Sequence, residues 1–268
     1  MSQLITKDNY PYQSWSEKYP NHIVSLNDLS IDHSWKDIFD KLKTDKRYTE
    51  IEEYLSYCLE STKGKVKIYP YPDLIYSAFN HTPLDKVKVV FIGQDPYFNS
   101  ELDDNSKIIP QAMGLSFSVP VGVTVPPSLA NIYKNMVANN ELIKKPSHGN
   151  LEFWAYQGCL MINTVLTVQA GVANSHADYW VWCTDQIIKY ISDNTKNIIF
   201  VLWGAPALDK LKLIDKTTHK ILISSHPSGL SCARPLRSYS SFNNSNHFGE
   251  INKYLEENGK EKIIWQLF

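Results

Sequence analysis

Four short runs of apolar residues stand out along the chain. They occupy residues 87–93, 159–163, 198–204 and 220–225. Each run has the length of a β-strand, is rich in branched side chains and is largely apolar on both faces. Segments with helical character, such as residues 128–137 and 182–193, separate the runs. This alternation predicts an α/β fold with a central four-stranded parallel twisted sheet flanked by helices.

The amino-terminal part of the chain has a different pattern. Residues 1–31 are polar, rich in Tyr, Ser and Asn, and show no clear periodicity. We interpret them as an N-terminal extension to a domain that spans residues 32–268. Between residues 32 and 60 apolar side chains recur at helical spacing, which predicts a helix over that range with Ser34 as a candidate N-cap.

The residues that follow the four apolar runs are candidates for chemistry. They are QDPYF (94–98), NT (163–164), APA (205–207) and HPSGLS (226–231). In open α/β folds, ligands bind beyond the carboxyl ends of the strands. All four segments are polar, contain proline, or both, so they could meet in one crevice. Four ordinary strand-to-helix turns remain the alternative.

Composition narrows the class of protein without identifying a partner. The chain has 268 residues, of which 43% are hydrophobic and 21% are charged, as expected for a globular domain. Its net charge of −1 gives no basic footprint of the kind that nucleic-acid enzymes usually carry. The sequence contains no apolar run of membrane-spanning length, and its first residues lack the pattern of a secretory signal.

The four cysteines suggest reduced thiols. Cys58, Cys159, Cys183 and Cys232 form no C-x-x-C pair, and their spacing fits no zinc site. Reduced thiols are typical of an intracellular protein, cytoplasmic or nuclear. No metal cluster, Gly-rich phosphate loop or nucleotide fingerprint is present in the sequence, so we expect no cofactor.

Five motifs occur in a specific order along the chain. They are GQDPYFN (93–99), GLSFSVP (114–120), VPPSLANIY (125–133), INTVLTV (162–168) and HPSGLS (226–231). In these motifs the chain from about residue 32 to residue 268 resembles family-1 uracil-DNA glycosylases. The resemblance implies a DNA-repair hydrolase that flips uracil out of DNA and hydrolyses its N-glycosidic bond. The products would be an abasic site and free uracil, the first step of base excision repair.

The resemblance assigns catalysis to two residues. Asp95 would orient the attacking water and stabilise positive charge on the sugar; taken alone, an N-cap or Asx-turn before Pro96 would be the better explanation of this residue. His226, as a neutral imidazole, would donate a hydrogen bond to uracil O2, where negative charge develops. Other histidines lie near the motifs, but no chemistry requires them. They are His148, His176 and His247.

Four further residues would bind the base. Asn163 would accept from uracil N3–H and donate to O4, whereas cytosine presents the reverse pair and is rejected. Tyr97 would fill the space that the 5-methyl group of thymine needs. Phe117 would stack on the flipped base, and Gln94 would contribute backbone contacts.

The remaining implied contacts are with DNA. Leu230 would enter the base stack that uracil has left, because the target base must be extruded from the duplex. Ser128, Ser228 and Arg234 would contact the DNA backbone. The expected substrate is uracil-containing DNA, single- or double-stranded. We expect a monomer without membrane attachment, and a proteinaceous uracil-glycosylase inhibitor as a further partner.

The chain departs from the family pattern mainly at positions near the DNA backbone. Phe98 stands where His is usual, Ala205 where Ser is usual, and Ala233 where His is usual, while Gly229 replaces a proline. We therefore expect the grip on DNA to differ more than the chemistry.

Two segments are longer than is usual in the family: residues 99–111 and 235–246. The first carries Glu101, Asp103 and Asp104 near the expected active site, where negative charge would face phosphate. Those acidic side chains could point away from DNA, contact a partner or be disordered, and the sequence leaves these alternatives open.

Other functions were weighed against the glycosylase. A binding module that keeps only the fold would have no need for all the chemical residues together. A zinc deaminase needs H-x-E and P-C-x-x-C, and both are absent from the sequence. A mismatch-directed relative of the same superfamily resembles the motifs less closely. Frequent Asn, Lys and Ile are typical of an AT-rich genome and leave a viral origin open.

Overall fold

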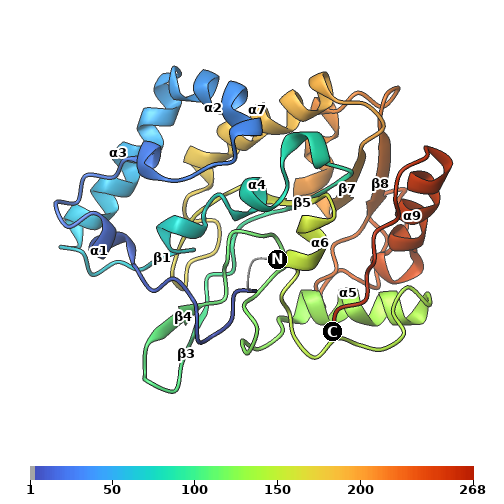
Figure 1. Cartoon of the computed structure of the whole chain (residues 1–268), viewed down its shortest axis with the longest axis horizontal. Coiled ribbons are helices and arrows are strands. Elements are labelled where there is room, and N and C mark those ends of the chain that lie inside the picture. Colours follow the sequence, from blue (N-terminus) through green and yellow to red (C-terminus); the bar gives the residue numbers. More distant parts are fainter. Residues whose placement is uncertain (1–3) are drawn as a thin grey trace.

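The computed structural model describes residues 4–268, and a four-stranded parallel sheet lies at its centre (Figure 1). The strands are β2 (Val89–Gly93), β5 (Cys159–Asn163), β7 (Ile199–Trp203) and β8 (Lys220–Ser224). Their order in the sheet is β5-β2-β7-β8, and every neighbouring pair is parallel. The predicted fold class and all four predicted strands are confirmed.

The register of the sheet brings the strand ends together. Gly93, the last residue of β2, pairs with Asn163, the last residue of β5. Trp203, at the end of β7, pairs with Ser224, at the end of β8. The segments that follow all four strands therefore leave the sheet at the same edge.

Helices cover both faces of the sheet. They are α1 (Trp15–Lys18), α2 (Lys36–Lys43), α3 (Lys46–Ser61), α4 (Ser77–His81), α5 (Pro127–Ala138), α6 (Glu152–Tyr156), α7 (Ala177–Asn194), α8 (Ala205–Leu208) and α9 (His247–Glu257). Short 3-10 turns lie at Leu26–Asp28, His33–Trp35, Pro72–Leu74, Leu84–Lys86, Asp209–Leu213 and Phe242–Asn244. The long helices α3 and α7 pack together with α2 on one side of the sheet, and α5, α6 and α9 lie on the other (Figure 1).

The single helix predicted over residues 32–60 is wrong, because the chain breaks at Thr44–Asp45 into α2 and α3. Asp45 has an extended backbone, and its side chain accepts from the N–H of Arg47. Aspartate is a strong N-cap, so it starts a second helix within the range where one helix was expected. The prediction of Ser34 as a cap is also wrong. Asp32 caps the preceding 3-10 turn by accepting from the N–H of Ser34.

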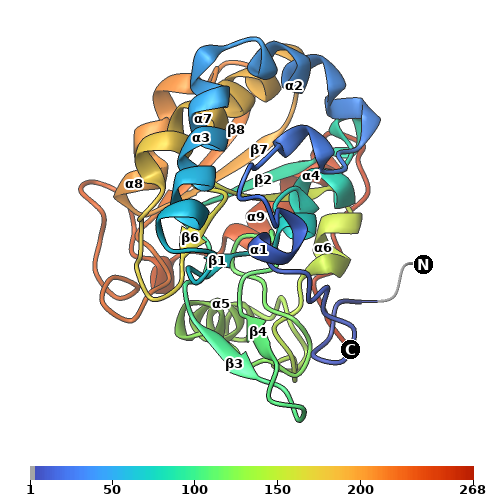
Figure 2. The same cartoon turned by 90° about the vertical axis from the view of Figure 1, so that its left-hand side faces the viewer.

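Two small antiparallel sheets accompany the central one. β1 (Ile68–Tyr69) pairs with β6 (Val168–Gln169), and β3 (Ser100–Leu102) pairs with β4 (Ile108–Pro110). The β3–β4 hairpin is the insertion at 99–111, so that segment has regular structure. Figure 2 shows the hairpin extending from the body of the molecule on the same side as α5.

The part of the extension that the structure describes packs against the domain. Between residues 4 and 31 six large side chains are buried: Tyr10, Trp15, Tyr19, Val24, Leu26 and Leu29. The indole N–H of Trp15 donates to the carbonyl of Pro70 at 2.9 Å. Although residues 4–31 are polar in composition, these buried side chains fix the segment to the domain. The domain boundary at residue 31 stays a prediction.

All four cysteines are buried and free. Within residues 4–268 no helix is long and apolar enough to cross a membrane. In the same part of the chain, no three His, Cys, Asp or Glu side chains are grouped so that they could hold a metal ion.

Candidate active site

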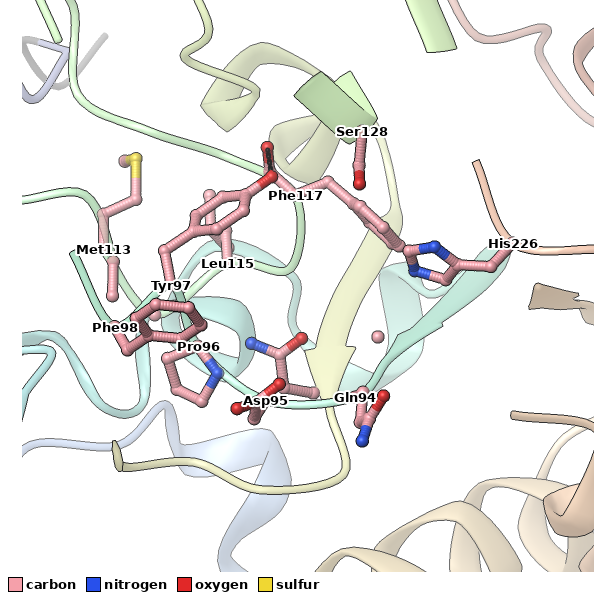
Figure 3. Close-up of a pocket in the computed structure, with 14 residues that line it drawn as sticks. Gln94, Asp95, Pro96, Tyr97, Phe98, Met113, Leu115, Phe117, Ser128 and His226 are labelled. Atoms are coloured by element: carbon pink, nitrogen blue, oxygen red, sulfur yellow. Dashed lines mark hydrogen bonds between the residues drawn. The ribbon is translucent and has the colours of Figure 1, made fainter. Parts of the chain in front are cut away.

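A pocket of about 150 Å³ opens at the carboxyl edge of the sheet, with side chains from distant segments pointing toward it (Figure 3). A cavity of about this volume accepts one benzene ring, so the pocket has room for a single pyrimidine. Seven of the ten predicted site residues line it. They are Gln94, Asp95, Tyr97, Phe117, Ser128, Asn163 and His226.

The carboxylate of Asp95 is held by a backbone group from another loop. Asp95 is partly buried, and its Oδ2 accepts from the N–H of Asn174 at 2.7 Å. Burial raises the pKa of the Asp95 carboxyl, and backbone hydrogen bonds from Asn174 and from Asp95 itself lower it in part. Asn174 has a positive φ of 60°, a conformation that Asn tolerates better than most residues. This arrangement fixes the Oδ2 atom of Asp95 at the wall of the pocket.

The segment behind Asp95 is tied to the end of β5. The carbonyl of Gln94 accepts from the hydroxyl of Thr164 at 2.8 Å and from the N–H of Val165 at 3.0 Å. The turn that carries Asp95 is therefore bonded to the strand that carries Asn163, and neither can shift without the other.

The imidazole of His226 is neutral and has a defined tautomer. Its Nδ1 accepts from the N–H of Ser228 at 3.0 Å, so the ring proton is on Nε2. Burial lowers the pKa of His226 to about 4. At neutral pH the ring therefore presents an uncharged N–H donor at the pocket.

Asn163 presents its amide to the pocket without a competing partner. Within residues 4–268 its side chain makes no hydrogen bond, although the residue is only partly exposed. Gly93 is required beside it, because a Cβ at that position would collide with the amide oxygen of Asn163. An unpaired amide in a small pocket is a donor and acceptor pair available to a ligand.

Two aromatic residues form opposite parts of the wall. Phe117 has a positive φ of 65°, which is a strained backbone conformation for a bulky residue. Its ring contacts the ring of Trp203 edge to face, with 5.4 Å between the two ring centroids. The hydroxyl of Tyr97 donates to the carbonyl of Phe117 at 3.3 Å. This contact fixes the spacing between the two side chains, so the width of the pocket is set before a ligand arrives.

The other three predicted residues lie beside the pocket. Ser228, Leu230 and Arg234 line an adjoining groove of about 620 Å³ that shares Gln94 and His226 with the pocket. Leu230 is 87% exposed, so burial in this chain does not explain an apolar residue there. The loop that presents it is closed by the N–H of Cys232, which donates to the carbonyl of Ser228 at 2.8 Å.

Two of the four departures from the family pattern lie in these two spaces. Phe98 lines the pocket and Ala205 lines the groove. Ala233 is exposed and lines neither of these two spaces. Thus Phe98 and Ala205 replace polar groups at surfaces that a ligand could contact.

Sequence reasoning missed residues that act through their backbones or through packing. Asn174 holds Asp95 with an N–H, which any residue type except proline offers. Ala112, Met113 and Leu115 complete the pocket wall. His176 is buried and shares a hydrogen bond with the hydroxyl of Thr167 at 2.9 Å, outside the pocket. For Asn174 the only signal in the sequence was the NSH segment at 174–176, since Asn tolerates the positive φ that the turn there requires.

Comparisons with known proteins show which family this chain belongs to. The model of the uracil DNA glycosylase superfamily matches residues 79–256. A probable uracil-DNA glycosylase of Acanthamoeba polyphaga mimivirus is 38% identical over 98% of this chain and 72% of its own length. A uracil-DNA glycosylase of Francisella tularensis is 45% identical over 87% of this chain and 99% of its own.

A solved structure is similar over the same extent. The crystal structure of a mimivirus UNG variant in complex with UGI has a TM-score of 0.92 and 38% identity, covering 98% of this chain and 99% of that one. The structure of mimivirus uracil-DNA glycosylase has a TM-score of 0.91. With a family match over more than half of the chain, and relatives this similar over most of it, this chain belongs to the uracil-DNA glycosylase superfamily.

Proposed function

We propose that the pocket receives a uracil flipped out of DNA, and that Asp95 and His226 are the residues that break its glycosidic bond. Enzymes of this family excise uracil from DNA as the first step of base excision repair, and this chain is such a glycosylase. The observation that carries the residue assignment is that one carboxylate and one neutral imidazole N–H line the same pocket of single-ring size.

The two residues act on opposite charges of one transition state. As the bond between C1′ and N1 breaks, the electron pair leaves with uracil, and its O2 accepts the Nε2–H of His226. The sugar becomes positive and is stabilised by the carboxylate of Asp95. The oxygen of a water oriented by Asp95 forms the new bond to C1′, and Asp95 receives its proton. The leaving uracil anion takes up a proton on release.

Base identity is read by hydrogen bonding and by shape. The unpaired amide of Asn163 accepts from N3–H and donates to O4 of uracil, while Phe117 stacks on the ring. Tyr97 occupies the space of a 5-methyl group. Gln94 supplies backbone contacts to the base, although its carbonyl is already engaged by Thr164 and Val165, so its N–H is the available group.

The residues that contact DNA lie in the groove and in the first turn of α5. The side chain of Leu230 fills the space that the base has left in the stack, which also buries its exposed apolar surface. Ser128, in the first turn of α5, and Ser228 contact phosphates, as does Arg234. A helix start favours a phosphate because its backbone N–H groups are unpaired.

We predict that Asn163 and Tyr97 together set base preference. Asn163→Asp should admit cytosine, because a carboxylate accepts from its exocyclic amine. Tyr97→Ala should admit thymine, because the methyl group gains room. Release of each base from defined oligonucleotides measures both effects, and Val137→Ala, an exposed change on α5, serves as the control. Unchanged preference in both variants would assign recognition to other residues.

The proposed function is tested with a panel of DNA substrates. These are uracil in a single strand, U·A, U·G, T·G and C·G pairs. We expect release of uracil from the first three, no release of thymine or cytosine, and an intact abasic strand as the product. Release confined to mismatched pairs would favour a mismatch-directed enzyme, and binding without release would leave a scaffold.

Partners and origin are proposed on the same basis. A relative has been crystallised with UGI, and the high structural similarity supports a protein inhibitor that docks over the pocket and groove of this chain. The mimivirus relative supports a viral origin. Action as a monomer inside an infected cell, in cytoplasm or nucleus, is the proposal consistent with buried reduced cysteines.

A further inference from the structure

We propose that residues 5–12, here called the strap, position the wall of the base pocket, and that Tyr10 is the positioning residue. This inference rests on the proposed function, because it concerns how well the pocket holds uracil. Of the residues in the strap, none lines the pocket. Its effect must therefore pass through residues 112–121, the segment that carries the wall.

The start of the strap is bonded to the far end of the wall segment. The N–H of Val121 donates to the carbonyl of Ile5 at 3.0 Å, and the N–H of Lys7 donates to the carbonyl of Val121 at 2.9 Å. The N–H of Ile5 donates to the carboxylate of Glu152 at 2.7 Å. Glu152 is only 1% exposed and also accepts from His81 and Asn150. A fully bonded buried carboxylate is a fixed anchor for the strap.

Tyr10 is bonded to the near end of the same segment. It is 2% exposed, and its hydroxyl donates to the carbonyl of Ala112 at 2.9 Å. Ala112 and the following Met113 line the pocket. The strap therefore contacts the wall segment at both ends, and Phe117 lies between the two contacts.

The wall segment depends on such contacts because it contains no helix or strand. Within it, the carbonyl of Gly114 accepts from Ala78, the N–H of Ser116 donates to Met161, and the carbonyl of Phe117 accepts from Tyr97. Phe117 must also be kept at positive φ, which its side chain disfavours. Loss of one anchor leaves a buried carbonyl unpaired and lets the segment relax toward a less strained shape.

The acidic insertion, residues 99–111, also binds the strap. Glu101 forms an ion pair with Lys7 at 3.2 Å, and the hydroxyl of Tyr12 donates to Asp103 at 2.7 Å. That hydrogen bond is the largest cause of a lowered pKa at Asp103. Two of the three acidic side chains whose place beside DNA the sequence left open thus bind the strap. The long hairpin and the extension form one structural unit.

The test compares Tyr10→Phe with Tyr19→Phe. Both changes remove a hydroxyl that donates to a backbone carbonyl from a buried tyrosine of the extension, since Tyr19 donates to Ser25 at 2.6 Å. Only Tyr10 contacts the wall. We expect Tyr10→Phe to weaken inhibition by free uracil by about 2- to 10-fold, the equivalent of one hydrogen bond, and to lower kcat/KM at least as much. Tyr19→Phe should leave both at the wild-type value.

A merely structural role predicts a different result. Both variants would then lower the melting temperature alike and leave uracil inhibition, measured well below that temperature, unchanged. Tyr12→Phe, at a partly exposed site, removes the hydrogen bond to Asp103 and should weaken inhibition in the same direction. Wild-type inhibition in both Tyr10→Phe and Tyr12→Phe would overturn the inference. Absence of uracil release by the wild-type protein would instead overturn the proposed function.

Discussion

Replacing Asp95 by Asn should slow the chemical step of uracil release by about 10²- to 10⁴-fold, the range for a positioned acid or base. The amide oxygen can still accept from the N–H of Asn174, so the local structure survives. It carries no negative charge to stabilise the sugar cation, and it cannot take a proton from water. Single-turnover release from a uracil oligonucleotide measures the effect, and binding to an uncleavable analogue should be retained.

The control for this variant is Asp209→Asn, which removes one charge from an exposed position away from the pocket.

The activity of the wild-type protein should also fall when the pH is lowered into the acid range. Because burial raises the pKa of Asp95, the active carboxylate is lost as pH decreases through that raised value, earlier than for an ordinary aspartate. Full single-turnover activity in Asp95→Asn would remove the residue from its proposed role.

Replacing His226 by Ala should cost about 10²- to 10³-fold in kcat, the usual effect of losing one donor to a developing oxyanion. The Nε2–H is fixed by the backbone of Ser228 and is uncharged at neutral pH. In the alanine variant the departing uracil has no hydrogen-bond donor at O2, whereas the proposed contacts to DNA at Ser128 and Arg234 remain. The split between kcat and affinity is measured under single-turnover conditions.

A separate observation checks the state of the ring. Since its pKa is about 4, the imidazole should stay neutral when pH is lowered through 6.5, where ordinary histidines gain a proton. Nitrogen NMR of His226 reports this directly. A loss confined to affinity in His226→Ala would make the residue a phosphate contact.

The strands and the convergence of their ends could be predicted from the sequence because burial on both faces leaves continuous apolar runs. Asp95 and His226 each lie two residues beyond such a strand, and Asn163 ends one. Topology then places them at one edge whatever the loops do. The motif order added the roles, which the positions alone leave open.

The remaining features depend on contacts between residues far apart in the chain. Lys7 and Glu101 are separated by 94 residues, and each alone looks like a solvated surface charge. Nothing in the identity of Phe117 suggests a positive φ. The break before α3 was recognisable in principle from Asp45 and from the apolar spacing. On one continuous helix, Tyr48, Ile51 and Leu55 would lie nearly opposite to the face that carries the buried residues of α2.

The paired ends of β2 and β5 limit how this enzyme could be redirected. Gly93 and Asn163 are register partners, on strands separated by about 4.8 Å. Asn163, proposed to read the base, and the turn that carries Asp95, proposed to orient the attacking water, are therefore held in fixed positions by the same pair of strands. A larger or shifted base would move its C1′ away from Asp95 even if its hydrogen bonds were satisfied. Re-engineering for another lesion would therefore have to rebuild the opposite wall around Phe117 and Tyr97, and leave the strands alone.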